Sequence, residues 1–108
     1  MHFKPKPFYE ARARVAKALA HPSRLLILDA LEEKEACVCE LTDLVGADQS
    51  TVSKHLSVLK NAGIVGDRKE GSMTYYHLRI KCLAGFFGCI ESVLKENLKS
   101  RREELSSR

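Results

Sequence analysis

Apolar residues recur at helical spacing along most of the chain and give way to a strand-like pattern in one region. Residues 8–20 place their apolar side chains near one face, which predicts a short alanine-rich helix. Pro22 then fits the first turn of a second helix, where its missing N–H costs nothing. The apolar face is formed by Phe8, Ala11, Val15 and Leu19 in the first helix and by Leu25, Leu28 and Leu31 in the second.

Two further helices are predicted in close succession. The first covers about residues 38–45 and ends at Gly46, because glycine accepts the left-handed conformation common just after a helix. The second begins near residue 49, with Asp48 or Ser50 as its N-cap, and stops at Gly63. It turns Val52, Leu56 and Leu59 inward and leaves a face of small polar side chains and a lysine outward.

A β-hairpin and a long helix complete the pattern. The runs 64–69 and 73–78 favour strands, and Gly71 supplies the turn between them. From about residue 80 past residue 98, large apolar residues return at helical spacing, followed by a polar end expected to fray. These residues are Leu83, Phe86, Phe87, Ile90, Leu94 and Leu98.

The 108 residues fit one domain with a modest core that a partner chain completes. We expect a mostly α-helical fold with one β-hairpin, a winged helix-turn-helix. Its parts are a flexible arm (1–7), dimerisation helices (8–20 and 80–100), a helix-turn-helix (38–62) and a wing (64–78). The apolar stripe of the last helix is large for so small a domain, and pairing as a homodimer buries it.

Charge is unevenly distributed. The net charge is +4, which permits a polyanionic partner. Residues 29–43 hold six acids and one lysine, whereas residues 47–81 hold six basic and three acidic residues. No apolar leader or membrane-length apolar run is seen, so a cytoplasmic location without membrane association is expected, in a bacterial or archaeal nucleoid.

The order of short helix, glycine turn, polar-faced helix and basic hairpin indicates binding to double-stranded DNA. Small hydroxyls, an amide and a lysine can approach base edges and phosphates. No catalytic triad, carboxylate pair or phosphate-binding glycine loop is present, so an enzyme is not expected. The candidate DNA-binding residues are Gln49, Ser50, Thr51, Ser53, Lys54, His55, Ser57, Arg68 and Lys69.

Three segments carry a family resemblance: "LAHPSRLLILDAL", "CVCELTDLVGADQSTVSKHLSVLKNAGIVGDRKEGSMTYYHL" and the last helix. Over about residues 10–98 the chain resembles the ArsR/SmtB family of metal-responsive repressors, and most closely its arsenical-resistance members. The resemblance implies a homodimer joined through its first and last helices. It also implies binding to an imperfect palindrome at the protein's own promoter, with release when an inducer binds.

The resemblance directs attention to Cys37 and Cys39. The "CVC" segment resembles the arsenic- and antimony-binding site of these repressors, and thiolates prefer such soft ions. As(III) or Sb(III) is therefore the expected inducer, and no cofactor is required for DNA binding. Two sulfurs at positions i and i+2 of a regular helix point about 200° apart. We therefore expect ion binding to distort the first turn, and a Cys37–Cys39 disulfide to be strained.

The third ligand is open. Many arsenical-resistance repressors carry a cysteine where this chain has Thr42. Cys82 and Cys89 are weak candidates, as are a residue of the other protomer, an external thiol and water. At the positions that resemble the family's zinc site on the last helix, only Glu96 is retained, and the others hold Ile80, Cys82 and Val93. The histidines His21, His55 and His77 favour structural or phosphate-facing roles.

Three hypotheses follow. The first is a repressor released by arsenite or antimonite at Cys37 and Cys39. The second keeps the fold but changes the signal: a redox or persulfide response that pairs one of these cysteines with Cys82 or Cys89, or a response to cadmium or lead. The third is a constitutive DNA-binding protein with inert cysteines.

Overall fold

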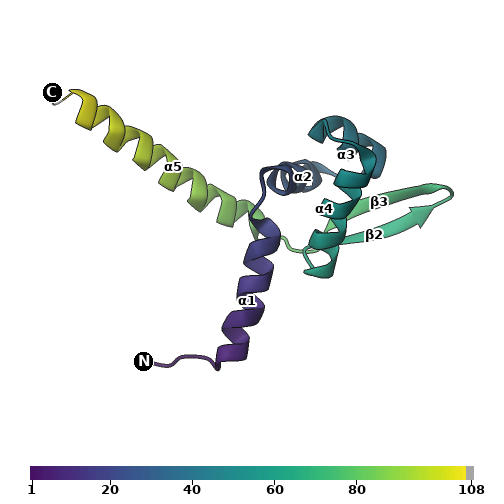
Figure 1. The fold of residues 1–108 in the computed structure, drawn as a ribbon, viewed down its shortest axis with the longest axis horizontal. Helices are drawn as coiled ribbons and strands as arrows, with labels where there is room; N and C mark the ends of the chain where they lie inside the picture. Colours follow the sequence, from purple (N-terminus) through teal and green to yellow (C-terminus); the bar gives the residue numbers. More distant parts are fainter. Residues whose placement is uncertain (107–108) are drawn as a thin grey trace.

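The predicted apolar faces meet in one core, formed by the second to fourth helices and the base of the hairpin (Figure 1). The structure is a computed structural model that describes residues 1–106. Its elements are α1 (Lys6–Leu19), α2 (Pro22–Glu33), β1 (Ala36–Cys37), α3 (Val38–Val45), α4 (Gln49–Asn61), β2 (Val65–Glu70), β3 (Met73–Leu78) and α5 (Leu83–Ser106). The largest fully buried side chains are Ile27, Leu28, Leu41, Val52, Leu56, Leu59, Ile64 and Val65.

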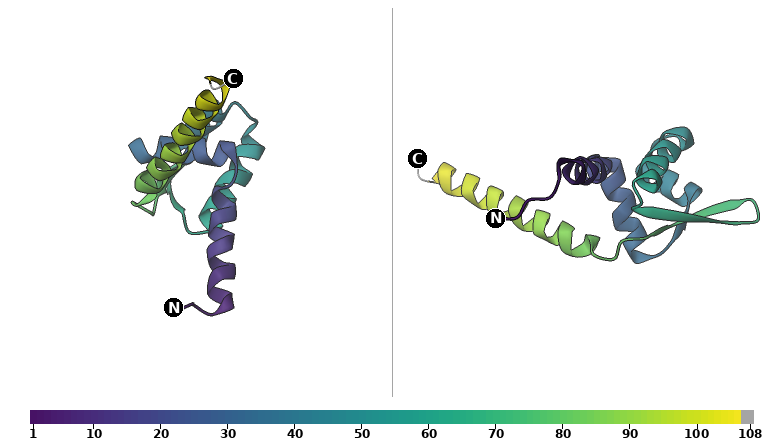
Figure 2. Two further views of the ribbon diagram at one scale, coloured as in Figure 1. Left: turned by 90° about the vertical axis from the view of Figure 1, so that its left-hand side faces the viewer. Right: turned by 90° about the horizontal axis from the view of Figure 1, so that it is seen from below.

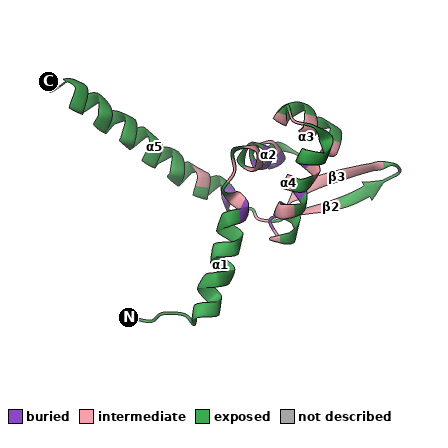
Figure 3. Cartoon of the chain, in the orientation of Figure 1, coloured by how far each residue is buried: buried purple, intermediate pink, exposed green. Residues whose placement is uncertain are grey.

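Helices α1 and α5 project away from this core, and α5 and the hairpin extend from opposite sides of it (Figure 2). Figure 3 shows both helices as largely exposed. In α5 only Leu83 is buried, whereas Leu94 and Leu98 are 56% and 58% exposed. None of the described helices combines the length and the apolarity needed to cross a lipid bilayer.

The largest boundary differences from the sequence-based prediction lie in the two outer helices, whereas β2 is shifted by one residue from the predicted run 64–69. Helix α1 begins at Lys6, because a hydrogen bond from the Phe8 N–H to the Pro5 carbonyl, at 3.0 Å, forms its first turn. The predicted arm 1–7 is therefore shortened to residues 1–5. Helix α5 begins at Leu83, since the two preceding residues form a turn, and its last turn extends to Ser106. The expected fraying end is helical as far as that residue.

Strand β1 was not predicted. It is two residues long and pairs antiparallel with β3, so that β3 is the central strand of a three-stranded sheet in the order β1-β3-β2. Its register places Ala36 opposite Tyr76 and Cys37 opposite Tyr75. The hairpin is therefore joined, through main-chain hydrogen bonds, to the segment that immediately precedes α3.

Candidate DNA-reading face and thiol site

The start of helix α4 is held by local hydrogen bonds and is preceded by a glycine turn. At its start the Asp48 carboxylate accepts from the Thr51 N–H at 2.8 Å and from the Ser50 hydroxyl at 2.9 Å. Interactions with Thr51 and Ser50 lower the pKa of Asp48, so the cap is ionised at neutral pH. Before it, Gly46 adopts φ 75°, a left-handed turn residue that lets α4 leave α3 at an angle. The turn and the cap together fix the orientation of the polar face.

The structure leaves most of the predicted DNA-binding side chains accessible. Ser53 and His55 are half-buried. The exposed candidates are Gln49, Ser50, Thr51, Lys54, Ser57, Arg68 and Lys69. The exposed face of α4 thus begins at its N-terminus, where free N–H groups favour an approaching phosphate.

His55 lies differently from the prediction. Its Nδ1 accepts a hydrogen bond from Arg24 Nε at 3.2 Å, and its ring packs against His21 with the ring centroids 4.3 Å apart. Burial lowers the pKa of His55, so the imidazole is neutral at neutral pH. The sequence placed His55 on the DNA-facing surface because α4 is polar there. The structure instead shows it packed against α2, through an arginine that sequence alone does not connect to it.

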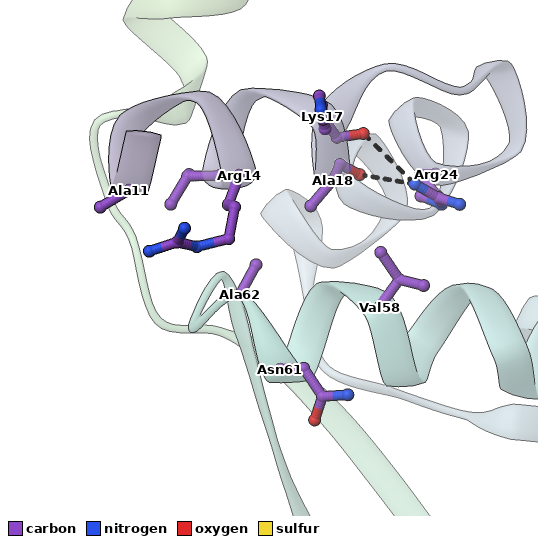
Figure 4. A pocket seen from close by; sticks show the side chains of 9 residues that line it. Ala11, Arg14, Lys17, Ala18, Arg24, Val58, Asn61 and Ala62 are labelled. Atoms are coloured by element: carbon purple, nitrogen blue, oxygen red, sulfur yellow. Dashed lines mark hydrogen bonds between the residues drawn. The ribbon is translucent and has the colours of Figure 1, made fainter. Parts of the chain in front are cut away.

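Arg24 also borders the groove between α1 and α4, which has a volume of about 590 Å³ (Figure 4). Its Nη1 donates to the main-chain carbonyls of Lys17 and Ala18, each at 3.4 Å. One side chain therefore ties the end of α1 to α4. Neither Cys37 nor Cys39 lines this groove, so it is separate from the candidate thiol site.

The two basic residues of the wing differ in their surroundings. Arg68 is ion-paired with Glu35 and with Glu70, the latter at 2.7 Å, and its guanidinium lies 4.8 Å from the centroid of the Tyr75 ring. Lys69 is exposed on the neighbouring position of β2. Because Arg68 already has two carboxylate partners, Lys69 is the better placed of the two to meet a phosphate.

Replacing Lys54 by alanine is expected to weaken DNA binding and to reduce the slope of log affinity against log salt by about one unit. The reason is that an exposed lysine in the first two turns of α4 releases one counterion on meeting a phosphate. The slope is measured by fluorescence anisotropy at several salt concentrations. Lys95→Ala on α5 makes the same change in net charge and serves as the control. Equal slopes for Lys54→Ala and the parent protein would contradict a phosphate contact.

The thiol site is built at the start of α3. Cys37 is the N-cap of this helix, with an extended backbone (φ −82°, ψ 164°), and its Sγ accepts from the Glu40 N–H at 3.4 Å. In return the Glu40 carboxylate accepts from the Cys37 N–H at 3.4 Å. Together these two bonds form a capping box, a role usually filled by serine or threonine. Cys37 therefore lies just outside the helix and Cys39 within its first turn.

This position corrects the predicted geometry. The two sulfurs are 3.0 Å apart, and no distortion of the helix is needed to bring them together. The expectation of sulfurs about 200° apart assumed that both residues were helical. Because Cys37 has the extended backbone of a cap, its side chain points forward over the first turn toward Cys39.

The two thiols differ in accessibility and in proton affinity. Cys37 is 4% exposed, whereas Cys39 is exposed. The hydrogen bond with Cys39 raises the pKa of Cys37, and the Glu40 N–H opposes it with a smaller effect. Cys37 is therefore a thiol rather than a thiolate at neutral pH in the free protein.

Within residues 1–106, no third metal-ligating side chain is gathered around the two sulfurs. Among the described residues, no group of three or more His, Cys, Asp or Glu side chains is arranged to hold a metal ion. Cys82 and Cys89 are exposed, and in this structure neither forms a cluster with Cys37 and Cys39. Thr42, at the position of the absent cysteine, donates its hydroxyl to the Val38 carbonyl at 2.8 Å.

Sequence reasoning missed one residue of this region. Glu35 precedes β1 and reaches Arg68 of β2, 33 residues away in the chain. Its acidic neighbours hid it, because nothing distinguishes one glutamate of an acidic segment from the next. The hydrogen bond with Arg68 lowers the pKa of Glu35.

A capped, polar-faced helix after a glycine turn, together with a β-hairpin, defines a winged helix-turn-helix DNA-binding transcription regulator. Comparison with known proteins identifies the family. Residues 21–66 match the family model for the arsR family of bacterial regulatory proteins. This match, together with the similarity to a possible ArsR-family domain of Mycobacterium bovis, shows that the chain belongs to the ArsR family.

Three similar proteins illustrate the relationship. An HTH-type transcriptional regulator of Methanocaldococcus jannaschii is 45% identical over 71 residues, covering 65% of this chain and 80% of that protein. The solution structure of a homodimeric winged helix-turn-helix domain of Mycobacterium bovis, a possible ArsR-family regulator, matches with a TM-score of 0.75. That domain is 33% identical, with 93% of this chain and 95% of the other covered. A cadmium resistance regulatory protein of Staphylococcus aureus is 43% identical over 67 residues, covering 61% of this chain and 55% of that protein.

Proposed function

We propose that this chain is a transcriptional repressor that leaves its operator when arsenite or antimonite binds Cys37 and Cys39. The observation that carries the proposal is the 3.0 Å separation of the two sulfurs at the start of α3. Helix α3 directly precedes α4, the proposed DNA-reading helix. Thiolate ligands select soft ions. Neighbouring sulfurs supply two of the ligands, and the third comes from the partner protomer, an external thiol or water.

With the sulfurs already 3.0 Å apart, ion binding needs a small separation of Cys37 and Cys39 in place of the distortion of the first helical turn expected from the sequence. Tetrahedral zinc, with Zn–S bonds of about 2.3 Å, places two sulfurs roughly 3.8 Å apart, and two thiolates on one As(III) or Sb(III) also lie farther apart than 3.0 Å. The sulfurs must therefore move apart from 3.0 Å when the ion enters. A ligand shifts a conformational equilibrium only through its different affinities for the two states. In this proposal the form with the sulfurs 3.0 Å apart is the one that binds DNA, and the ion favours a second form in which they are farther apart.

A homodimer is the second part of the proposal. The exposed apolar stripes of α1 and α5 are the proposed seam, which agrees with the homodimeric state of the Mycobacterium bovis domain. Two reading helices related by twofold symmetry would meet half-sites about 34 Å apart, one turn of DNA, in an imperfect palindrome. The protein would then act on DNA in the cytoplasm.

The test is operator release by reduced protein titrated separately with arsenite, antimonite, cadmium, lead and zinc. The proposal expects release at the lowest concentration for arsenite or antimonite. Release by cadmium or lead alone would keep the thiol site and change the ion, in line with the cadmium resistance relative. No release by any of these ions would reject the ion response and leave a redox response or a constitutive DNA-binding protein.

One observation favours a second candidate function. Cys39 is exposed and Cys37 is buried behind it at 3.0 Å, so an oxidant can reach one sulfur while the other lies ready to attack it. Hydrogen peroxide would take two electrons from the pair, forming one S–S bond and releasing two molecules of water. Mass spectrometry is expected to find a Cys37–Cys39 disulfide, in place of the predicted pairing with Cys82 or Cys89. Retention of all four free thiols in peroxide would reject this function.

A further inference from the structure

Glu35 and Arg68 join the thiol segment to the wing across the central strand. Glu35 lies just before β1, Arg68 lies in β2, and β3 runs between these strands. Arg68 Nε donates to one oxygen of the Glu35 carboxylate at 3.2 Å, and its Nη2 donates to the other. A two-pronged pair of this kind fixes the orientation of both groups, and here it spans the full width of the sheet.

The same three strands align the thiol with this ion pair. Cys37 is the register partner of Tyr75, and Tyr75 is the register partner of Arg68. Side chains of directly opposed residues project from the same face of a sheet. The Cys37 thiol, the Tyr75 ring and the Arg68 guanidinium therefore form one row, in which the guanidinium lies 4.8 Å from the ring centroid.

A change at the thiols has a direct path along this row. Widening the sulfur separation from 3.0 Å requires Cys37 or Cys39 to move. Cys39 belongs to the first turn of α3, which the capping box ties to Cys37. Cys37 lies in β1, which pairs with β3 through main-chain hydrogen bonds. Glu35, two residues before Cys37, forms an ion pair with Arg68 of β2. Movement of the thiol segment therefore acts on both strands of the wing.

The ion pair is well suited to change during such a movement. The Arg68 and Glu35 side chains are 45% and 39% exposed, and exposed pairs contribute little to stability. The second carboxylate, that of Glu70, lies in the same strand as Arg68 and moves with it. Glu35 is therefore the partner that connects the wing to another part of the molecule.

We infer that Glu35 is a positioning residue. Through its ion pair with Arg68 it makes the orientation of the wing depend on the position of the segment that holds Cys37 and Cys39. This inference rests on the proposed function, because it names the route by which an ion at Cys37 and Cys39 reaches the DNA-binding surface. The sequence predicted that Arg68 contacts DNA. In this inference Arg68 is instead the wing residue that pairs with Glu35 and so connects the wing to the thiol segment.

The test compares Glu35→Gln with Glu33→Gln, since both remove one negative charge from the same acidic segment. Operator affinity is measured with and without saturating arsenite, and ion stoichiometry is measured separately by elemental analysis. Glu35→Gln is expected to bind the ion at the parent stoichiometry. The ratio of the two operator affinities should fall about 3- to 10-fold relative to the parent protein. Glu33→Gln should keep the parent ratio.

Hydrogen exchange provides the readout that a merely structural role would not move. Arsenite is expected to change amide exchange in residues 36–45 and in both wing strands, 65–70 and 73–78, of the parent protein. In Glu35→Gln the change in residues 65–70 should be lost, whereas β3 should still respond because it pairs directly with β1. An unchanged release ratio in Glu35→Gln, with the parent still released by arsenite, overturns the link alone. A parent protein that arsenite does not release overturns the proposed function and the link with it.

Discussion

The double replacement Cys37→Ser/Cys39→Ser is expected to keep operator binding and to lose the response to arsenite. In the parent protein the ion should lower operator affinity on the order of 10- to 100-fold, the usual size of coupling between two sites. In the serine variant the ratio should be about one. Serine hydroxyls are poor ligands for soft ions, and the pair at 3.0 Å supplies the two sulfurs of the site. The measurement is fluorescence anisotropy of labelled operator DNA with and without arsenite.

The choice of serine keeps the fold out of the comparison. Cys37 caps α3 through its sulfur, and serine is among the preferred N-cap residues, so the helix start is retained. Cys82→Ser/Cys89→Ser removes the same number of thiols away from the site and should respond like the parent. Operator release by arsenite in the Cys37→Ser/Cys39→Ser protein would show that the ion acts elsewhere.

Replacing Leu94 by glutamate is expected to convert the dimer to a monomer and to reduce operator affinity on the order of 100-fold or more. Leu94 is 56% exposed in the single chain, so a glutamate there buries no charge within one protomer. In the proposed dimer it would place a carboxylate in each half of an apolar seam. A monomer then contacts one half-site and loses the gain from binding two at once.

Molecular mass in solution and operator affinity are measured for the same Leu94→Glu sample, with circular dichroism confirming that the helices are retained. Ser92→Glu adds the same side chain on the opposite side of α5, because a two-residue step corresponds to about 200°. It is expected to remain dimeric. A dimeric Leu94→Glu protein with unchanged affinity would place the seam elsewhere.

The helix-turn-helix could be predicted from the sequence because its signals are local. Gly46 and Asp48 mark the turn and the cap, and the predicted helix 38–45 coincides with α3. The hairpin follows from a strand-like run on each side of Gly71, which has φ 64°. In each case neighbouring residues determine the conformation, so a reading of the sequence in windows is sufficient.

The candidate thiol site could be predicted only in part. The structure places the sulfurs of the two proposed cysteines side by side, but the predicted geometry was wrong, because a cysteine is an unusual N-cap and Cys37 was taken as a helical residue. Strand β1 is two residues long, too short to show an alternating pattern, and it exists through its pairing with β3. The contacts of Arg68 with Glu35 and of His55 with Arg24 join residues more than 30 positions apart. Such contacts follow from the tertiary fold and leave no signal in the sequence.

The capping role of Cys37 has an evolutionary consequence. A single-base change converts a cysteine codon to a serine codon, and serine maintains the start of α3 as well as the thiol does. A lineage can thus lose the proposed ion response at this position without any loss of stability that selection would remove. The reverse change restores a sulfur just as easily. Under the proposed function, the capacity to sense soft ions can therefore be gained and lost by changes at this position while the start of α3 is kept.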